Sequence, residues 1–443
     1  MDSRLRAYAE LNAPRYTSYP TAPHFNESVQ AGEYARWLGM LAPETLLSLY
    51  LHIPYCQDIC WYCGCNTFAL QREEPLRAYV EALERELRQV AAATPARRVR
   101  EIHWGGGTPN ILSPAQFRSI FDQVRALFDL SALREHAIEL DPRVLTPLHC
   151  VAYATVGVTR VSLGVQDLNP HVQAAMGRIQ PLKTVAAAFA HLRAAGIAGI
   201  SADLMYGLPR QSVADACASA REIAALAPNR IAVFGYAHVP WFKTRQRLID
   251  ESTLPDTDAR IAQAQAIRET LIAAGYEAIG FDHFAKPDDS LARAARSGGL
   301  HRNFQGYVDD DCGALIGVGA SAISTLPMGY AQNASDVTGW RSRLDESGFG
   351  TARGRALSAE DKVRRAVIER LLCDFAVDLR PFGGADAFRA EIARLTPLAA
   401  DGLCDLDGDR IVIPEKAQPY ARVVAQEFDA YRDLTGARHS RAV

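Results

Sequence analysis

Residues 50–65 read Tyr50-Leu-His-Ile-Pro-Tyr-Cys-Gln-Asp-Ile-Cys-Trp-Tyr-Cys-Gly-Cys65. The first three cysteines, Cys56, Cys60 and Cys63, are spaced Cys-x3-Cys-x2-Cys, and a fourth, Cys65, follows two residues later. Thiolates are soft ligands that select zinc, Cu(I) or iron–sulfur clusters. Three cysteines on one loop can hold three irons of a 4Fe-4S cluster and leave the fourth iron open to a ligand. Four cysteines would close the cluster and make it an electron carrier.

A structural zinc site is the main alternative for four clustered cysteines. Such sites usually combine two pairs of ligands that are separated by about a dozen residues. No gap of that length separates the cysteines of this loop. The spacing therefore favours an iron–sulfur cluster, and zinc stays open as the second interpretation.

Length and composition describe a globular protein without strong charge. The 443 residues correspond to about two or three domains, and 48% of them are apolar, which is enough for a large core. The net charge of −3 argues against nucleic acid as a partner, because proteins that bind nucleic acid carry a basic face. Residues 1–10 hold no apolar run and no stretch of 18 apolar residues occurs, so we expect neither a signal peptide nor a membrane span. We expect a protein of the reducing cytoplasm.

Five further cysteines are scattered singly along the chain. A disulfide framework is not expected in so long a chain with so large a potential core. We interpret these cysteines as small buried apolar residues. They are Cys150, Cys217, Cys312, Cys373 and Cys404.

Strands alternate with helices from residue 46 onward. The apolar strand Leu46–Ile53 ends where the cysteine loop begins, and the strand Arg100–Trp104 leads into Gly105-Gly-Gly-Thr-Pro109. Four more strands are predicted at Ala137–Leu140, Arg160–Leu163, Ile200–Met205 and Arg230–Phe234. Helices are predicted at Pro75–Val90, after a capping box at Ser113, at Leu182–Ala195 and at Val213–Leu226. This alternation predicts an α/β fold with a parallel sheet, and a wound sheet and a barrel both fit it.

Three ranges are expected along the chain. Residues 1–40 hold several turn formers and are expected to be an N-terminal extension, and residues 41–350 carry the α/β pattern and its continuation. The Gly-rich stretch 346–354 is interpreted as a linker. Residues 351–443 are expected to be a small, mostly helical C-terminal domain, in which Ser358 caps a helix and residues 406–412 form a short hairpin.

Polar side chains gather at or shortly beyond the ends of the predicted strands. Because α/β folds bind ligands at the carboxyl ends of their strands, we expect these residues to share one rim. Glu139, Gln166 and Asp203 suit ribose hydroxyls, and Arg178 suits a carboxylate through a bidentate fork. Singly, each is more often an ordinary surface or salt-bridging residue. The glycine run lets the backbone approach a ligand closely, and it is not a phosphate loop because no Gly-Lys-Ser/Thr ending follows.

Together these features resemble the radical S-adenosylmethionine (SAM) enzymes, in which such a cysteine triad and glycine run occur in this order. The resemblance narrows to the oxygen-independent coproporphyrinogen III oxidases and extends over nearly the whole chain. The motifs that carry it are Arg15-Tyr-Thr-Ser-Tyr-Pro-Thr21, Cys63-Gly-Cys65-Asn66, Gly164-Val-Gln-Asp167, Asp203-Leu-Met-Tyr-Gly-Leu-Pro209, Tyr236-Ala-His-Val-Pro240 and His301-Arg-Asn-Phe-Gln-Gly-Tyr307.

The resemblance implies a partial (βα)6 radical-SAM barrel with an N-terminal extension and a small, mostly helical C-terminal domain. It implies that Cys56, Cys60 and Cys63 bind a 4Fe-4S cluster, with one SAM at the open iron. Gln305 and Ile323 fall where such enzymes hold a second SAM. Cys65 would then not be a ligand. Carried over by motif, the residues expected to line SAM are Tyr50, Tyr62, Gly106, Gly107, Thr108, Glu139, Gln166, Arg178, Asp203 and Ala237.

The implied reaction is the oxygen-independent oxidative decarboxylation of two propionates of coproporphyrinogen III to vinyl groups. A 5′-deoxyadenosyl radical would start it, and protoporphyrinogen IX would be its product in haem biosynthesis. Expected partners are the porphyrinogen and an electron donor of the flavodoxin or ferredoxin type, and we expect a monomer. Candidate anchors for the substrate carboxylates are Arg15, Lys243, Arg245 and Arg302. A haem-binding chaperone of the same superfamily and a radical decarboxylase with another substrate are the alternatives.

Overall fold

The computed structural model of the protein describes residues 3–432. The chain forms two compact units, each assembled from segments that are far apart in sequence. The first unit combines the described parts of Met1–His24, Leu204–Asp311 and Ser358–Val443, and the second combines Phe25–Asp203 and Cys312–Leu357. The sequence predicted three contiguous ranges, 1–40, 41–350 and 351–443, whereas each compact unit combines separate segments. The boundaries of the three ranges stay a prediction.

The core of the second unit is a sheet built around β1 (Leu47–Ile53). This strand pairs in parallel with β4 (Val99–Gly106) on one side and with β13 (Ala314–Val318) on the other. All seven residues of β1 are buried, as expected for a strand that is covered on both faces. Beyond β4 the parallel part continues with β5 (Glu135–Leu140) and β6 (Arg160–Gln166). The carboxyl ends of these parallel strands therefore lie along one edge of the sheet.

An antiparallel meander continues the sheet beyond β13. Its strands are β14 (Ile323–Leu326), β15 (Gly329–Asn333) and β16 (Thr351–Ala356). The pairing of β16 with β15 begins at Thr351, inside the stretch 346–354, so the linker interpretation is wrong. Gly348 of that stretch ends helix α11 (Val337–Ser347) in the left-handed conformation, which explains why the glycine is there.

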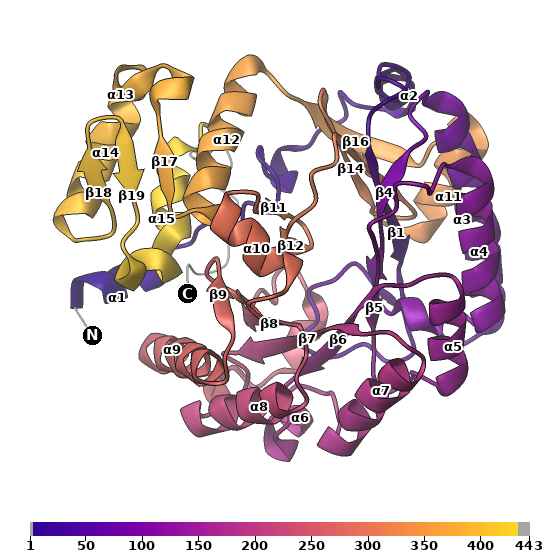
Figure 1. The fold of residues 1–443 in the computed structure, drawn as a ribbon, viewed down its shortest axis with the longest axis horizontal. Helices are drawn as coiled ribbons and strands as arrows, with labels where there is room; N and C mark the ends of the chain where they lie inside the picture. Colours follow the sequence, from indigo (N-terminus) through magenta and orange to yellow (C-terminus); the bar gives the residue numbers. More distant parts are fainter. Residues whose placement is uncertain (1–2, 433–443) are drawn as a thin grey trace. The chain divides into compact units, whose positions relative to one another are not determined.

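Helices that follow the parallel strands in the chain cover the sheet from outside (Figure 1). They are α3 (Glu73–Ala93) after β1, α4 (Pro114–Leu127) after β4, α5 (Pro147–Thr155) after β5 and α7 (Leu182–Ala194) after β6. The predicted capping box starts α4, since Gln116 N donates to Ser113 Oγ while Ser113 N donates to Gln116 Oε1.

Two more strand–helix pairs follow in chain order. They are β7 (Gly199–Tyr206) with α8 (Val213–Ala225) and β8 (Arg230–Gly235) with α9 (Thr257–Ala273). Residues 3–432 thus contain the six strand–helix pairs expected of a partial (βα)6 fold, and each of the six predicted strands lies within three residues of its predicted bounds. Within the first unit, β8 also pairs antiparallel with β10 (His283–Ala285), and β10 pairs with β9 (Glu277–Ile279).

The C-terminal part of the first unit is mostly helical, as expected. The predicted capping box at Ser358 begins α12 (Ala359–Cys373). The predicted hairpin consists of β18 (Asp405–Asp407) and β19 (Arg410–Val412), and β17 (Ala376–Asp378) adds a third strand. Gly408 makes the turn with a φ of +58°, which favours glycine.

Other elements complete the two units. The first unit also holds α1 (Ser3–Ala9), α10 (Ser290–Ser297), β11 (His301–Asn303), β12 (Gly306–Val308), α13 (Gly384–Ala387), α14 (Arg389–Ala400) and α15 (Ala421–Ala425). The second unit also holds α2 (Ala31–Gly39), β2 (Tyr55–Cys56), β3 (Phe68–Ala69) and α6 (Pro170–Ala175). Within the described part of the chain, none of the helices combines the length and the apolar character needed to cross a membrane.

A buried carboxylate ties α3 to the sheet of the second unit. Glu86 is 2% exposed, and its oxygens accept from Gly319 N at 2.7 Å, Asn333 Nδ2 at 2.8 Å, Trp340 Nε1 at 3.1 Å and Gly350 N at 3.3 Å. Burial raises the pKa of Glu86 to about 7, and these four donors oppose the rise. All four partners of Glu86 are hydrogen-bond donors. Residue 86 therefore needs a side chain whose polar atoms only accept hydrogen bonds.

Replacing Glu86 with glutamine should lower the stability of the fold. The amide NH2 would face N–H donors and leave at least one of them buried without an acceptor, which costs about 2–3 kcal/mol. Glu81→Gln, on the exposed side of the same helix, is the matched control and should change stability by less than about 0.5 kcal/mol. Urea unfolding of both variants measures the difference. Equal free energies of unfolding would contradict the role given to Glu86.

Candidate metal and cofactor site

The cysteine loop leaves the carboxyl end of β1 and is fastened there by backbone hydrogen bonds. Strands β2 and β3 pair in parallel and close the loop. Phe68 N donates to Pro54 O at 2.7 Å, and Leu70 N donates to Cys56 O at 2.8 Å. The loop therefore presents its cysteines at the edge where α/β proteins bind their ligands.

The sulfur atoms of the loop do not form one tight group. No three of its cysteines, all of which are described, bring their sulfurs within 4.8 Å of one another. A tetrahedral zinc ion with Zn–S bonds of about 2.3 Å would hold its thiolate sulfurs about 3.8 Å apart. The spacing therefore fits a cluster of several irons better than a single ion. Cys65 shares a hydrogen bond with Cys63, which raises the pKa of Cys65.

Two threonine hydroxyls contact the sulfur of Cys56. Thr108 Oγ1 donates to it at 3.1 Å, and Thr67 Oγ1 lies 3.2 Å from it. Burial raises the pKa of the Cys56 thiol, and both hydroxyls oppose the rise because they stabilise the thiolate. Thr108, which was predicted to line SAM, therefore also orients a predicted iron ligand.

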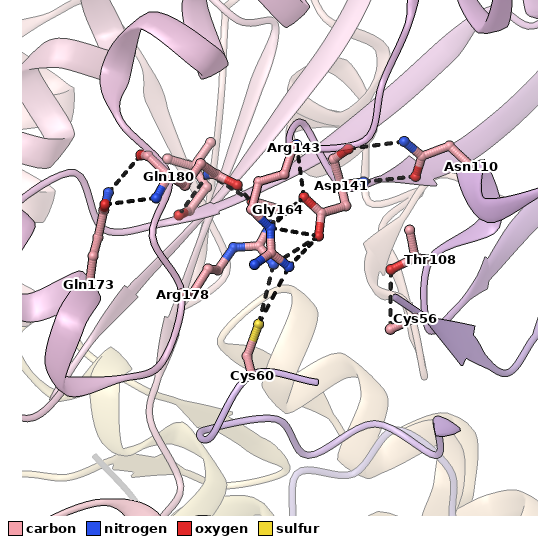
Figure 2. A network of polar contacts seen from close by, with 11 residues as sticks. Cys56, Cys60, Thr108, Asn110, Asp141, Arg143, Gly164, Gln173, Arg178 and Gln180 are labelled. Atoms are coloured by element: carbon pink, nitrogen blue, oxygen red, sulfur yellow. Dashed lines mark hydrogen bonds and ion pairs between the residues drawn. The ribbon is translucent and has the colours of Figure 1, made fainter. Parts of the chain in front are cut away.

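Two arginines face the sulfur of Cys60, as Figure 2 shows: Arg178 Nη1 lies 3.4 Å and Arg143 Nη2 lies 3.8 Å from it. Asp141 holds both guanidinium groups, with its Oδ2 2.6 Å from Arg143 Nη2 and 3.2 Å from Arg178 Nη1. Burial alone would raise the pKa of Asp141, but the hydrogen bonds of Arg143 and the charge of Arg178 lower it. Two cationic donors therefore lie beside the sulfur of Cys60, one of the predicted iron ligands.

Arg178 is fixed by contacts within the second unit. Its Nη2 donates to Gly164 O at 2.7 Å and to Gln180 Oε1 at 2.9 Å, and Gln180 N donates to Gln173 Oε1 at 2.8 Å. The sequence predicted a fork to a ligand carboxylate. In the structure the carboxylate paired with Arg178 is Asp141 of the same chain, while the buried Arg178 Nε has no hydrogen-bond partner.

The glycine run packs too closely for side chains. Gly106 adopts a φ of +116°, which favours glycine, and its N donates to Glu139 Oε2 at 3.2 Å. A Cβ at Gly107 would stand 2.4 Å from Thr67 Oγ1 and 2.7 Å from Tyr55 O. The run therefore brings bare backbone up to the base of the cysteine loop, as a cradle for a ligand would require.

Two carboxylates of the second unit, Glu139 and Asp203, lie near each other. Burial, and next the charge of Glu139, raises the pKa of Asp203 to about 7, while Ser162 Oγ donates to Asp203 at 3.1 Å. His103 Nε2 lies 3.1 Å from Glu139 Oε1, and the ring of Tyr50 stacks on His103 with centroids 5.9 Å apart. Acceptors placed in this way suit the hydroxyl groups of a ribose.

Three other predicted residues also belong to the second unit. Gln166 ends β6 with a φ of +71°. A Cβ at Gly164 would lie 3.1 Å from Gln166 Nε2 and 3.6 Å from Arg178 Nη2, so both side chains lie over this glycine. Burial raises the pKa of Tyr62, and the charge of Arg178 opposes the rise. Ile323 is the first residue of β14.

The remaining predicted residues belong to the first unit. They are Arg15, Ala237, Lys243, Arg245, Arg302 and Gln305. The cysteines and most predicted SAM residues thus share one compact unit, and all four candidate substrate anchors share the other.

Sequence reasoning missed Arg143 and His103. Arg143 comes two residues after Asp141 in an Asp-Pro-Arg run that directly follows β5, so its position beyond a strand end was the available signal. His103 lies two residues before Gly105 on β4, and strand alternation places the two on one face. Thr67 gave no signal, because only the folded loop brings it to Cys56.

Comparisons with known proteins agree with this geometry. The sequence model of the radical SAM superfamily matches residues 50–223. An oxygen-independent coproporphyrinogen III oxidase of Bradyrhizobium diazoefficiens is 46% identical over 99% of this chain and 98% of its own length. One from Escherichia coli is 39% identical over 95% of this chain and 93% of its own length. The solved structure of an E. coli coproporphyrinogen III oxidase, described as a radical SAM enzyme, superposes with a TM-score of 0.90 and 38% identity over 94% of this chain and 97% of that one.

Substituting Gly107 with alanine should disturb the seating of the cysteine loop. Its Cβ would collide with Thr67 Oγ1 and Tyr55 O, so the loop or the run must move. Misplaced ligand supports typically cost about 10-fold or more in metal affinity. Iron analysis after anaerobic reconstitution tests this. Gly64→Ala is the control, since a Cβ there meets nothing within 4 Å; similar iron contents in the two variants would refute the role of Gly107.

Proposed function

This chain belongs to the family of the oxygen-independent coproporphyrinogen III oxidases, within the radical SAM superfamily, and from this premise we propose how its residues divide the work. The enzyme is an oxidoreductase that converts two propionates of coproporphyrinogen III to vinyl groups and gives protoporphyrinogen IX in haem biosynthesis. Identity of 46% over nearly the full length carries this conclusion. The alternative of a haem-binding chaperone gains no support, because the relatives are named as oxidases.

Cys56, Cys60 and Cys63 would hold three irons of a 4Fe-4S cluster. Their sulfurs are too spread out for one tetrahedral ion, which supports a cluster. Thr108 and Arg178 donate to two of these sulfurs and so help to fix the positions of two proposed ligands. When bound, the cluster and SAM supply a 5′-deoxyadenosyl radical that can take hydrogen from an unactivated propionate carbon.

The glycine run and the two carboxylates would position SAM. The backbone at Gly106 and Gly107 can approach the amino-acid end of SAM closely, and Glu139 and Asp203 can accept from its ribose hydroxyls. Further proposed contacts are Tyr50, Tyr62, Thr108, Gln166, Arg178 and Ala237. Gln305 and Ile323 remain the proposed residues for a second SAM.

Cationic side chains of the first unit would anchor the substrate, because a porphyrinogen with four propionates needs partners for its carboxylates. The four candidates from the sequence are kept: Arg15, Lys243, Arg245 and Arg302. Lys243 Nζ lies 5.1 Å from the ring centroid of the exposed Phe242, so this segment combines charge with an apolar surface suited to a tetrapyrrole.

The remaining proposals concern the setting of the enzyme. Clusters of this kind have low potentials, so the electron for each SAM would come from a flavodoxin- or ferredoxin-type protein. All nine cysteines are described and none forms a disulfide, which supports a reducing compartment such as the cytoplasm. We keep the monomer as the proposed state.

Anaerobically reconstituted protein, given coproporphyrinogen III, SAM and a reductant, should form vinyl product, CO2 and 5′-deoxyadenosine. Serine in place of Cys60 should remove the activity by at least about a thousandfold, because the cluster loses a ligand. Product analysis by mass spectrometry measures this. Wild-type protein that holds its cluster but yields neither product nor 5′-deoxyadenosine would overturn the proposed function.

Serine in place of Cys65 should leave the cluster intact, because three other cysteines suffice to bind it. The variant should contain as much iron as the wild type. Its Mössbauer spectra should show, like those of the wild type, one iron site that differs from the other three. Loss of the cluster from Cys65→Ser would contradict the three-cysteine assignment.

A further inference from the structure

Three arginines of the first unit gather around one carboxylate. Arg302 in β11 lies with its Nη2 3.4 Å from Asp282 Oδ2 and donates from its Nε to Arg15 O at 3.4 Å. Arg422 in α15 donates from its Nη1 to Ala13 O at 3.0 Å, two residues along the same N-terminal segment. Arg15 itself donates from its Nη2 to Gly235 O at 3.1 Å. Segments from the start, middle and end of the chain thus meet here.

Positive charge exceeds negative charge in this cluster. Although burial alone would raise the pKa of Asp282, Arg302, His283 and Arg15 lower it to about 2, so Asp282 is ionised at neutral pH. Its other oxygen, Oδ1, lies 2.6 Å from His283 Nδ1. Burial, and next the charge of Arg15, lowers the pKa of Arg422 to about 10. One carboxylate therefore faces three guanidinium groups.

Burial makes this imbalance costly. The side chain of Arg302 is 5% exposed, and Arg422 is 7% exposed. Like charges in a poorly solvated place destabilise a fold unless an opposite charge joins them. Arg302 Nη1 is buried and has no hydrogen-bond partner. A buried N–H without an acceptor destabilises the fold, so the Nη1 of Arg302 is a position where a ligand acceptor would be favoured.

The guanidinium of Arg302 is also held in a fixed orientation. It stacks against the rings of Phe281 and Tyr307, each with its centroid 4.6 Å away. Arg15, in contrast, is exposed to solvent and gives an anion access to the cluster. Arginine guanidinium groups are well suited to bind a planar anion such as a carboxylate, because their N–H donors match its geometry.

We propose that Arg15, Arg302 and Arg422 bind one propionate carboxylate of the substrate, with Asp282 as the fixed counter-charge that orders them. This proposal rests on the proposed function and deepens it. It selects Arg15 and Arg302 from the four sequence candidates and adds Arg422, which no motif indicated. The carboxylate brings the missing negative charge and an acceptor for the buried Nη1 of Arg302.

Porphyrin binding to the reconstituted holoenzyme tests the proposal without catalysis. The probes are coproporphyrin III, which carries four free carboxylates, and its tetramethyl ester, which carries none. Arg15→Gln and Arg422→Gln should each weaken binding of coproporphyrin III about tenfold or more, by the usual loss for a charge-assisted hydrogen bond. Neither variant should change binding of the ester, and Arg15→Lys should recover part of the affinity.

Controls separate the proposal from its alternatives. Arg389→Gln, whose side chain is 80% exposed in the same unit, should bind coproporphyrin III like the wild type. If Arg422→Gln does not fold, the test rests on Arg15→Gln, because the side chain of Arg15 is exposed and its replacement should not disturb folding. The proposal would be overturned if Arg15→Gln bound coproporphyrin III with wild-type affinity. It would also be overturned if the variant lost affinity for SAM and kept its affinity for the porphyrin. A wild type that forms vinyl product while Arg15→Gln binds normally would refute this site and leave the proposed function standing.

Discussion

Three cysteine sulfurs must be held apart and supplied with hydrogen-bond donors at the end of a single strand, and the sheet and the glycine run of the second unit serve this requirement. Sulfurs brought closer together would suit one metal ion, and sulfurs buried without donors would stay protonated. The loop meets the first condition by spreading its cysteines after β1. It meets the second through Thr108 at Cys56 and Arg178 at Cys60. The parallel part of the sheet supplies both partners: Thr108 follows β4, and Arg178 lies in the segment after β6, with β5 between the two strands.

The same requirement explains why the glycine run cannot carry side chains. Gly107 fits against Thr67, which is itself in contact with Cys56, so the run and the loop are packed as one piece. Gly106 N reaches Glu139 from the same run. The groups proposed for the metal and those proposed for the ribose are thus coupled through backbone contacts. A shift in one group would therefore move the other.

The sequence predicted what is local or periodic. Patterns of apolar residues identified β1 and the five later strands, and the Ser113 and Ser358 boxes identified where helices begin. The polar residues of the predicted strands pointed to Glu139 and Asp203, and the charge of Glu139 does act on Asp203 in the structure. Contacts between distant segments were beyond such reasoning. Glu86 meets the 319–350 region, and Gly348 looked like part of a linker although it ends a helix. Arg422 reaches the N-terminal segment from a helix with no recognisable motif.

The central claim is that three cysteines leave one iron open for the amino-acid end of SAM. Electron–nuclear double resonance on the reduced cluster, with SAM labelled by 15N in its amino group and 17O in its carboxylate, tests this most directly. The account predicts hyperfine coupling of both labels to the cluster, because both atoms would bind the open iron. An intact cluster that shows no coupling to either label would contradict it.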